Sequence, residues 1–171
     1  MAEQKIIAIV RIRGNMETRG PVESTIMQLH LTRKNHCVLQ KDTIYLRGML
    51  KHAKDYIAWG EVDAKTVEAL FVKMGKTEGD KKLTDEYVAK NSKFKTVKEF
   101  SDAVFSGTAS WKDVKGLKPI FRLHPPLKGY GGSIKLPFPK GALGNRKDKM
   151  GALLQRMIPA FEPAVHPEEN R

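Results

Sequence analysis

Apolar side chains in the first sixty residues follow strand spacing and helix spacing in turn. Residues 6–13 form a dense run of β-branched residues that ends at Gly14, which predicts a strand whose first half is apolar on both faces. Val22, Ile26 and Leu29 then recur at helical spacing and predict one apolar stripe. The same reasoning predicts, in order, a strand over 6–13, a helix over 21–31, a strand over 36–40, a helix that begins after Thr43, and a strand over 57–62.

The predicted order is therefore β-α-β-α-β, and both connecting helices are amphipathic. The second helix carries its stripe at Leu46, Leu50 and Ala53, and Asp42-Thr43 before it is an N-cap signal. Two helices with one apolar stripe each must share one face of a small sheet. We therefore expect the other face of the sheet to be free to meet a partner.

A glycine interrupts the second predicted helix. Gly48 lies in the second turn, where glycine costs about 1 kcal/mol relative to alanine. Arg47, Lys51 and Lys54 fall on the faces away from the apolar stripe. The unfavourable glycine indicates that another group approaches the helix closely at this point.

Residues 63–158 are expected to form a mainly helical C-terminal elaboration. Helices are predicted after Asp63, Thr84 and Thr96, and a short strand is predicted over 120–123. A last helix is predicted to follow Asn145 as its N-cap. The expected buried positions are Val67, Leu70, Phe71 and Met74 in the first of these helices and Met150, Leu153, Leu154 and Met157 in the last.

The stretch 124–145 differs from the rest of this elaboration. It holds four prolines and five glycines without sustained periodicity, so we expect an irregular loop. Its cations are interleaved with Tyr130 and Phe138, and cations neutralise phosphates while aromatic rings stack on exposed bases. We expect this loop to be mobile in the isolated protein and ordered on RNA. Residues 159–171 are expected to form a flexible tail.

The charge is distributed unevenly along the chain. The formal net charge is +12, and residues 1–60 and 115–149 carry excesses of five and eight positive charges, whereas residues 61–114 are balanced. An excess this large implies an anionic partner, either nucleic acid or a membrane surface. Membrane binding would require a helix with a strongly basic face and a wide apolar face, which the last predicted helix only approaches.

The single cysteine and the short apolar runs argue against a disulfide-bonded protein, a cysteine-based zinc protein and a membrane-spanning protein. Cys37 is the only cysteine, so one chain can form neither a disulfide nor a cysteine-based zinc site, and we expect a small buried strand residue. No apolar run approaches the roughly 20 residues that cross a bilayer. Residues 1–4 lack the basic-then-apolar order of a signal peptide, so we expect a cytoplasmic protein.

The sequence offers no motif for a cofactor or for catalysis. Residues 129–132, Gly-Tyr-Gly-Gly, lack both the ending of a P-loop and the setting of a dinucleotide site. No histidine pair has the His-Glu-x-x-His spacing, and the carboxylates are scattered. We therefore expect no metal, no cofactor, no small-molecule substrate and no enzymatic activity. A ribosome assembly factor or an RNA-modifying enzyme stays open as the alternative to a structural RNA-binding protein.

One short motif supports a more specific interpretation. Residues 42–43 (Asp-Thr), followed after three residues by 47–49 (Arg-Gly-Met), closely resemble the signature of the large-subunit ribosomal protein thirty family. The strand that ends at 11–14 (Arg-Ile-Arg-Gly) and the element order are similar to that family over residues 5–62. Residues 121–126 (Phe-Arg-Leu-His-Pro-Pro) and the basic loop after them resemble the long, archaeal-type form.

The resemblance carries expectations about fold and partners. It implies an α+β, ferredoxin-like core over residues 1–62, with a three-stranded antiparallel sheet in the order 3-1-2 and helices on one face, and an elaboration over 63–158. It implies no enzymatic activity and no cofactor. The implied partners are large-subunit ribosomal RNA, with 5S rRNA nearby, and other large-subunit ribosomal proteins, without a membrane. The implied role is assembly and structural support of the subunit.

The candidate RNA contacts are cations, histidines and one aromatic residue from the two basic flanks. They are Arg11, Arg13, Arg19, Arg33, Lys34, Arg47, Lys51, His52, Lys54, Arg122, His124, Lys128, Tyr130, Lys135, Lys140, Arg146 and Lys147.

Overall fold

The computed structural model describes residues 5–16 and 18–159. The flexible tail expected over 159–171 lies, except for its first residue, outside the described residues. The strands are β1 (Ile6–Arg11), β2 (His36–Lys41), β3 (Ile57–Glu61), β4 (Phe121–Arg122), β5 (Ser133–Pro137) and β6 (Gly141–Asn145). The helices are α1 (Gly20–Gln28), α2 (Ile44–His52), α3 (Ala64–Met74), α4 (Asp85–Asn91), α5 (Val97–Phe105) and α6 (Met150–Met157), with short 3-10 turns η1 (Glu78–Asp80), η2 (Trp111–Asp113) and η3 (Lys147–Lys149).

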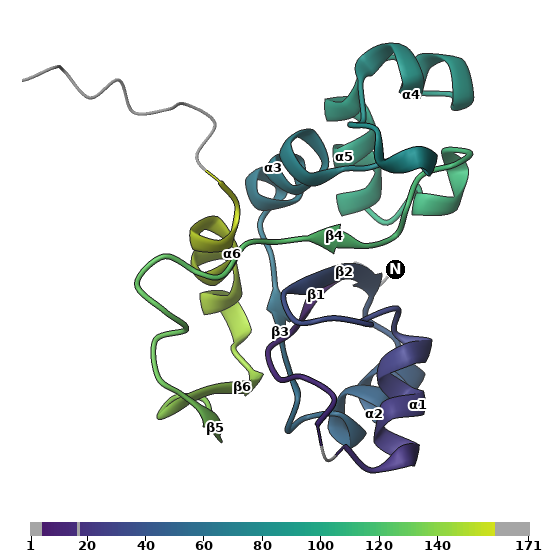
Figure 1. Ribbon diagram of the computed structural model, residues 1–171. Coiled ribbons are helices and arrows are strands. Elements are labelled where there is room, and N and C mark those ends of the chain that lie inside the picture. The colour runs from purple at the N-terminus through teal and green to yellow at the C-terminus, as the bar shows by residue number, and fades with distance from the viewer. Residues whose placement is uncertain (1–4, 17, 160–171) are drawn as a thin grey trace, which may run out of the picture.

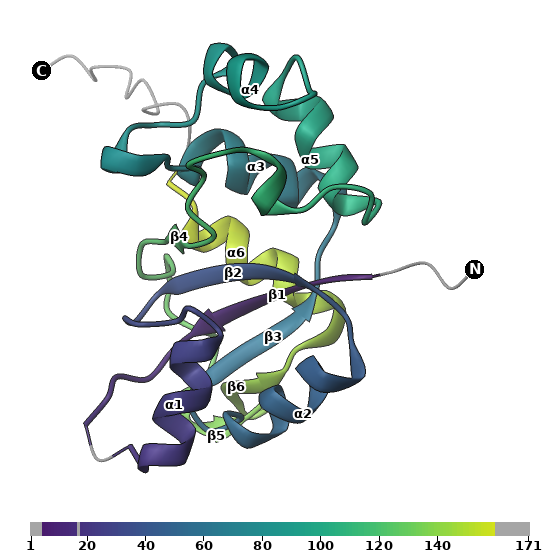
Figure 2. The same ribbon diagram turned by 90° about the vertical axis from the view of Figure 1, so that its right-hand side faces the viewer.

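Strand β1 is the centre of the predicted β-α-β-α-β unit. It pairs antiparallel with β2 on one side and with β3 on the other, and Ile9 lies opposite Val38 and Trp59. The predicted strand order 3-1-2 is therefore confirmed for these three strands. Figure 2 shows them side by side, with α1 and α2 in front of them.

The expectation of a sheet with only three antiparallel strands was wrong. The sheet has six strands in the order β4-β2-β1-β3-β6-β5. Strand β4 pairs antiparallel with β2, whereas β6 pairs parallel with β3 and β5 pairs parallel with β6. Two of the added strands come from the stretch 124–145, which therefore contains regular structure that its proline and glycine content did not predict.

Backbone pairing and a few small apolar side chains hold β6 in place. The amide of Arg146, just after β6, donates to the carbonyl of Trp59 at 2.8 Å. Ala142 and Leu143 are buried in a small cluster with Ile12 and Ala58. Strand β5, in contrast, is exposed along its whole length and is hydrogen-bonded to the sheet at its edge, next to β6.

Helices cover both faces of the central strands. Ile26 of α1 and Leu46 and Leu50 of α2 are buried in one cluster with Ile7 and Ile9 of β1, as the apolar stripes predicted. In Figure 1, α1 and α2 lie on one side of the sheet and α6 lies on the other, with α3, α4 and α5 above. The sheet is thus a middle layer rather than an open platform.

The second face of the sheet, expected to be free, is buried by the C-terminal elaboration. Ile6, Ala8 and Val10 of β1 belong to the same cluster as the predicted stripes of α3 and α6. Phe71 of α3 meets Phe100 of α5 with ring centroids 5.1 Å apart, and it meets Phe121 of β4 at 5.2 Å. A first strand that is apolar on both faces needs two such covers, since an uncovered face would expose its isoleucines to water.

Threonine caps open several helices as predicted. The hydroxyl oxygens of Thr43, Thr84 and Thr96 accept hydrogen bonds from the amides three residues later at 3.2, 3.4 and 3.2 Å. Asp63 stands at the N-cap of α3 without a side-chain cap bond. Asn145 is the last residue of β6, and its Oδ1 accepts from the amide of Lys147 at 2.9 Å at the start of η3. Since α6 begins only at Met150, Asn145 caps the turn that leads into α6 rather than α6 itself.

Truncation of Leu50 tests the predicted inner face of α2. Leu50 is 1% exposed, so Leu50→Ala should lower the free energy of unfolding by about 2–5 kcal/mol through lost contacts and a residual cavity. The urea midpoint, followed by circular dichroism, measures the loss. Leu127→Ala is the control, because Leu127 is 69% exposed. An unchanged midpoint for Leu50→Ala would show that α2 packs through another face.

Candidate nucleic-acid interface

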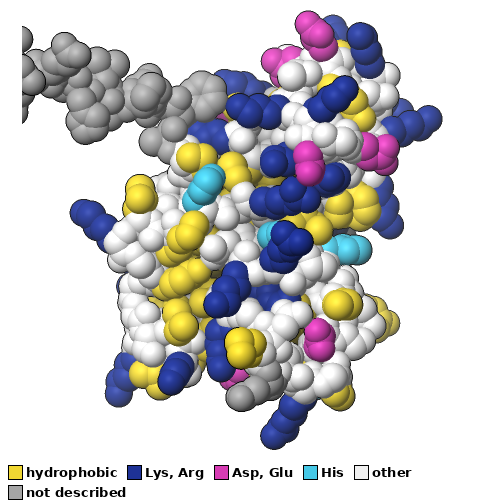
Figure 3. All heavy atoms as spheres, in the orientation of Figure 1, with side chains coloured by type: hydrophobic (Ala, Val, Ile, Leu, Met, Phe, Trp, Pro, Cys, Tyr) yellow, Lys and Arg dark blue, Asp and Glu magenta, His cyan; other side chains and the backbone are white. Residues whose placement is uncertain are grey.

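Lysine and arginine side chains gather on the surface over the junction between the upper helices and the sheet. Figure 3 shows them down the middle of one face, with acidic side chains mostly toward the upper edge. Among the described residues, most of the predicted RNA contacts are exposed or half-buried. They fall into separate groups because the central strands, covered by helices on both faces, present no single broad surface.

The outer face of α2 forms the first group. Leu46 and Leu50 are buried, whereas Arg47 and Gly48 between them are exposed. Ile44 and Tyr45 are 86% and 87% exposed. Apart from the backbone of α2 itself, a Cβ added at Gly48 would meet no heavy atom of the described residues within 4 Å. The close approach that Gly48 predicts is therefore not made by any described part of this chain, and the surface around it is open.

Cations and one histidine surround this open surface. Arg47, Lys51, His52 and Lys54 are all exposed on or just after α2. The Nδ1 atom of His52 lies 3.1 Å from the hydroxyl of Thr25 on α1, which ties the two helices together at their outer side. We call Ile44, Tyr45, Arg47, Gly48, Lys51 and His52 the outer face of α2.

Lys147 joins two of these cations at a hollow of about 300 Å³ between α2 and β3. Arg47 and Lys51 line the hollow from α2, and Lys147 lines it from η3. Arg47 donates to Asp42 Oδ1 at 2.8 Å through Nε, and this bond lowers the pKa of the Asp42 carboxyl. The structure thus brings Lys147 next to two predicted contacts that precede it by about one hundred residues in the sequence.

Arg11 was predicted to contact RNA, and the structure corrects that interpretation. The side chain is 1% exposed, and its guanidinium donates to the carbonyls of Leu31 at 2.7 Å, Thr32 at 3.1 Å and Arg13 at 2.8 Å, and to the side chain of Asn15. Burial lowers the pKa of Arg11. Its donors are used inside the protein, where they join the end of β1 to the chain that follows α1.

Arg146 requires the same correction. It is 5% exposed, and it donates to the carbonyls of Tyr130 at 3.2 Å and Ala142 at 3.3 Å. Burial is the main cause that lowers its pKa. The Tyr130 hydroxyl in turn donates to Asn35 Oδ1 at 2.5 Å, and its ring is half-buried against the core. Both side chains hold the 124–145 segment to the sheet: the terminal nitrogens of Arg146 and the Tyr130 hydroxyl are engaged within the chain, whereas Arg146 Nε is buried without a partner among the described residues.

The remaining predicted contacts lie at the surface in smaller groups. Arg13 is half-buried, with its guanidinium 5.1 Å from the ring centroid of Tyr56. Arg33 and Arg122 line one hollow beside β4. The other predicted contacts are exposed without a described ion pair: Arg19, Lys34, Lys54, His124, Lys128, Lys135 and Lys140. Lys76 and Lys118 share the hollow beside β4. No sequence pattern indicated them, because they lie outside both the basic loop and the second predicted helix.

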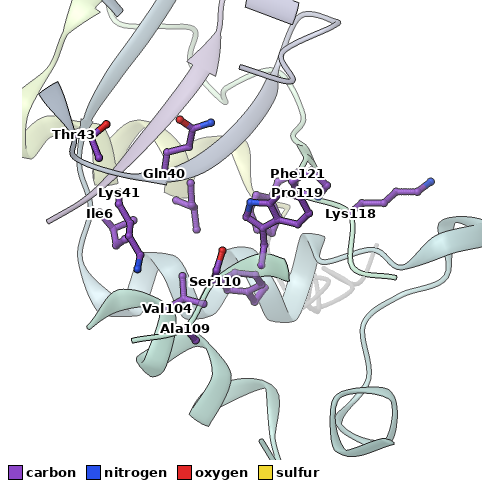
Figure 4. Close-up of a pocket in the computed structure, with 13 residues that line it drawn as sticks. Ile6, Gln40, Lys41, Thr43, Val104, Ala109, Ser110, Lys118, Pro119 and Phe121 are labelled. Carbon is purple, nitrogen blue, oxygen red and sulfur yellow. The ribbon is translucent and has the colours of Figure 1, made fainter. Parts of the chain in front are cut away.

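A second kind of hollow lies between β2 and the segment after α5 (Figure 4). Its volume is about 270 Å³, and Ile6, Val104 and Phe121 contribute apolar walls. Lys41 at its rim donates to the carbonyl of Gly107 at 2.6 Å. The lining contains no carboxylate, histidine or cysteine. Over residues 5–16 and 18–159, no group of three or more potential metal ligands is placed to hold a metal ion.

Known proteins similar to this chain share one family. The family described as ribosomal protein L30p/L7e matches residues 7–57. The chain is 43% identical over 152 residues to the large ribosomal subunit protein uL30 of Archaeoglobus fulgidus, which covers 89% of this chain and 99% of that relative. It is 41% identical over 150 residues to uL30 of Methanocella arvoryzae, covering 88% and 98%, and 42% identical over 151 residues to uL30 of Methanoregula boonei, also covering 88% and 98%.

Arg11→Ala separates a structural role from RNA contact. Removing the guanidinium leaves the buried carbonyls of Leu31 and Thr32 without donors, so we expect a loss of stability of about 1–3 kcal/mol for each unsatisfied group. Urea unfolding measures the loss. Arg19→Ala is the control, since Arg19 is exposed and its truncation should change stability by no more than about 0.5 kcal/mol. Unchanged stability of Arg11→Ala together with weaker RNA binding would restore the original interpretation.

Proposed function

The chain belongs to the ribosomal protein L30p/L7e family, and we propose from this membership that it is a structural constituent of the large ribosomal subunit that binds ribosomal RNA. The relatives that support this proposal are named large ribosomal subunit protein uL30. A structural rather than an enzymatic role follows from the same membership. The alternative of an assembly factor or an RNA-modifying enzyme receives no support from these relatives.

The composition of the outer face of α2 is the main structural support for RNA binding. It combines an exposed aromatic ring at Tyr45, an open glycine at Gly48 and the cations Arg47 and Lys51. Cations neutralise backbone phosphates, and an exposed ring can stack on an unpaired base. An open glycine lets a phosphate backbone approach the helix more closely than any side chain would allow.

The open space beside Gly48 also indicates that α2 packs against a partner that is not part of this chain. Gly48 is exposed within α2, and a methyl group there would meet nothing in the described chain. Glycine at such a position costs about 1 kcal/mol relative to alanine without any gain from internal packing. A ligand that packs against the bare backbone would provide the missing gain, and RNA fits the surrounding charge.

The proposed partners extend beyond the RNA that α2 meets. We infer that the 5S rRNA lies nearby and that other large-subunit proteins are neighbours, on the basis of the similarity to the long, archaeal-type form. Leu127 and the exposed strand β5, with Ile134 and Leu136 at 45% and 47% exposure, offer apolar contacts for such protein neighbours. Across the described residues, no helix is both long enough and apolar enough to cross a membrane.

Gly48→Leu tests the function and the face that carries it. The purified chain should bind transcribed large-subunit ribosomal RNA with an affinity that falls steeply as salt rises, and it should prefer this RNA to heparin. Gly48→Leu should keep or raise thermal stability, because leucine is the better helix former and the site is open. Its RNA affinity should fall at least about tenfold, or about 1.4 kcal/mol.

Ala89→Leu on α4 is the matched control, since Ala89 is exposed on a helix away from the cations of α2. It should bind RNA as the natural chain does. Salt-independent binding, or equal affinity for heparin and ribosomal RNA, would contradict the proposed function. Full affinity of Gly48→Leu would show that RNA does not meet the outer face of α2.

A further inference from the structure

A small basic hollow lies beside β4, at the outer edge of the sheet and away from the outer face of α2. Its volume is about 220 Å³, and its lining includes Arg33, His36, Lys76, Lys118 and Arg122. These residues come from the chain before β2, the start of β2, the segment after α3, the segment before β4, and β4 itself. Four cations and a histidine from distant parts of the sequence thus line one small hollow.

Backbone hydrogen bonds set the positions of these side chains. Strand pairing places His36 of β2 directly opposite Arg122 of β4. The amide of Lys118 donates to the carbonyl of Lys76 at 2.9 Å, which holds these two lysines next to each other. The convergence of like charges therefore follows from the fold, and it would be unfavourable without an anion close by.

His36 contributes a ring N–H, at Nε2, that is available to a ligand. It is 7% exposed, and its Nδ1 accepts a hydrogen bond from the Arg33 amide at 3.3 Å, with the Thr32 hydroxyl at the same distance. The proton of the neutral ring then resides on Nε2. Both hydrogen bonds of the ring use Nδ1, and among the described residues none is made to Nε2. Burial, followed by the charges of Arg122, Arg33 and Arg11, lowers the pKa of His36 and keeps the ring neutral at physiological pH.

A carboxylate of the chain already holds two of the cations at the rim. Asp80 of η1 accepts from Lys118 Nζ at 2.6 Å and from Arg122 Nη1 at 3.1 Å, and both bonds lower the pKa of Asp80. The side chain of Asp80 is about half exposed. The described contacts give the ammonium of Lys76 and the guanidinium of Arg33 no carboxylate of their own. One carboxylate among four cations leaves the hollow strongly positive.

We propose that this hollow binds one backbone phosphate of ribosomal RNA, with donors from Arg33, His36, Lys76, Lys118 and Arg122. The proposal rests on the proposed function, and it names a second RNA-binding site for the same protein. A phosphate has acceptor oxygens in several directions, which suits donors that converge from several segments better than a flat carboxylate does. Asp80 positions Lys118 and Arg122 in the free protein and shares them with the phosphate in the complex.

The test combines substitutions with phosphate ethylation of the RNA. Transcribed large-subunit RNA is ethylated at random phosphates, and the positions at which ethylation prevents binding are mapped for each protein variant. Lys76→Gln and Arg122→Gln probe the hollow. Lys90→Gln on α4 is the matched control, because Lys90 is exposed and lies outside the hollow. Lys76→Gln breaks no described ion pair, so it serves even if Arg122→Gln affects folding.

The expected result is one phosphate position that matters for the natural chain and for Lys90→Gln but not for Lys76→Gln or Arg122→Gln. The log–log salt slope of these two variants should fall by about one unit. When salt rises from 50 to 200 mM, the affinity of the natural chain should therefore fall by a factor about fourfold larger than that of these two variants. Asp80→Asn should keep the interference position and bind more tightly, because it removes a competing negative charge.

The outcomes separate this proposal from the proposed function. If the natural chain binds the RNA while Lys76→Gln and Arg122→Gln keep its interference pattern and salt slope, the phosphate site is wrong and the function stands. Such a result would also be expected if the hollow held a free phosphate ion or an acidic segment of another protein. A natural chain that does not prefer ribosomal RNA would overturn the proposed function, and the phosphate site would fall with it.

Discussion

Strand β1 lies between two layers of helices, so all six of its residues are buried. Ile7 and Ile9 pack toward α1 and α2, whereas Ile6, Ala8 and Val10 pack toward α3 and α6. Burying apolar surface on both faces provides most of the favourable free energy of the fold, and it also removes both faces of the sheet from contact with RNA. Every proposed RNA contact must therefore lie on the outside of a helix, at an edge of the sheet or in a loop.

The two proposed RNA sites follow from this constraint. The outer face of α2 becomes free because Leu46 and Leu50 use the inner face. The basic hollow forms at β4, the last strand on one edge of the sheet. The α2 site lies at the other half of the sheet, because Lys147, which lines the same hollow as Arg47 and Lys51, lies beside β3. Two sites on a rigid layered fold can hold two RNA segments at a fixed separation, which is what structural support of folded RNA requires.

Local sequence signals predicted the β-α-β-α-β unit and the stripes of α3 and α6, because each depends on residues within a few positions of one another. Strand β6 escaped prediction because backbone pairing to β3 holds it, and its small residues show no alternation. Arg11 and Arg146 resembled surface cations, since the carbonyls that accept their hydrogen bonds come from distant segments. Lys76 and Lys118 meet through one backbone hydrogen bond that no spacing in the sequence reveals.

Cys37 reports most directly on whether both faces of the sheet stay covered. It is the only cysteine of the chain, it is 0% exposed on the face covered by the C-terminal elaboration, and burial raises the pKa of its thiol. The measurement is the rate of Cys37 alkylation by iodoacetamide as urea is increased. The layered fold predicts that the thiol reacts only through global unfolding, with the same urea dependence as the unfolding equilibrium. Rapid alkylation without urea would contradict it, because the elaboration would then leave the second face of the sheet open.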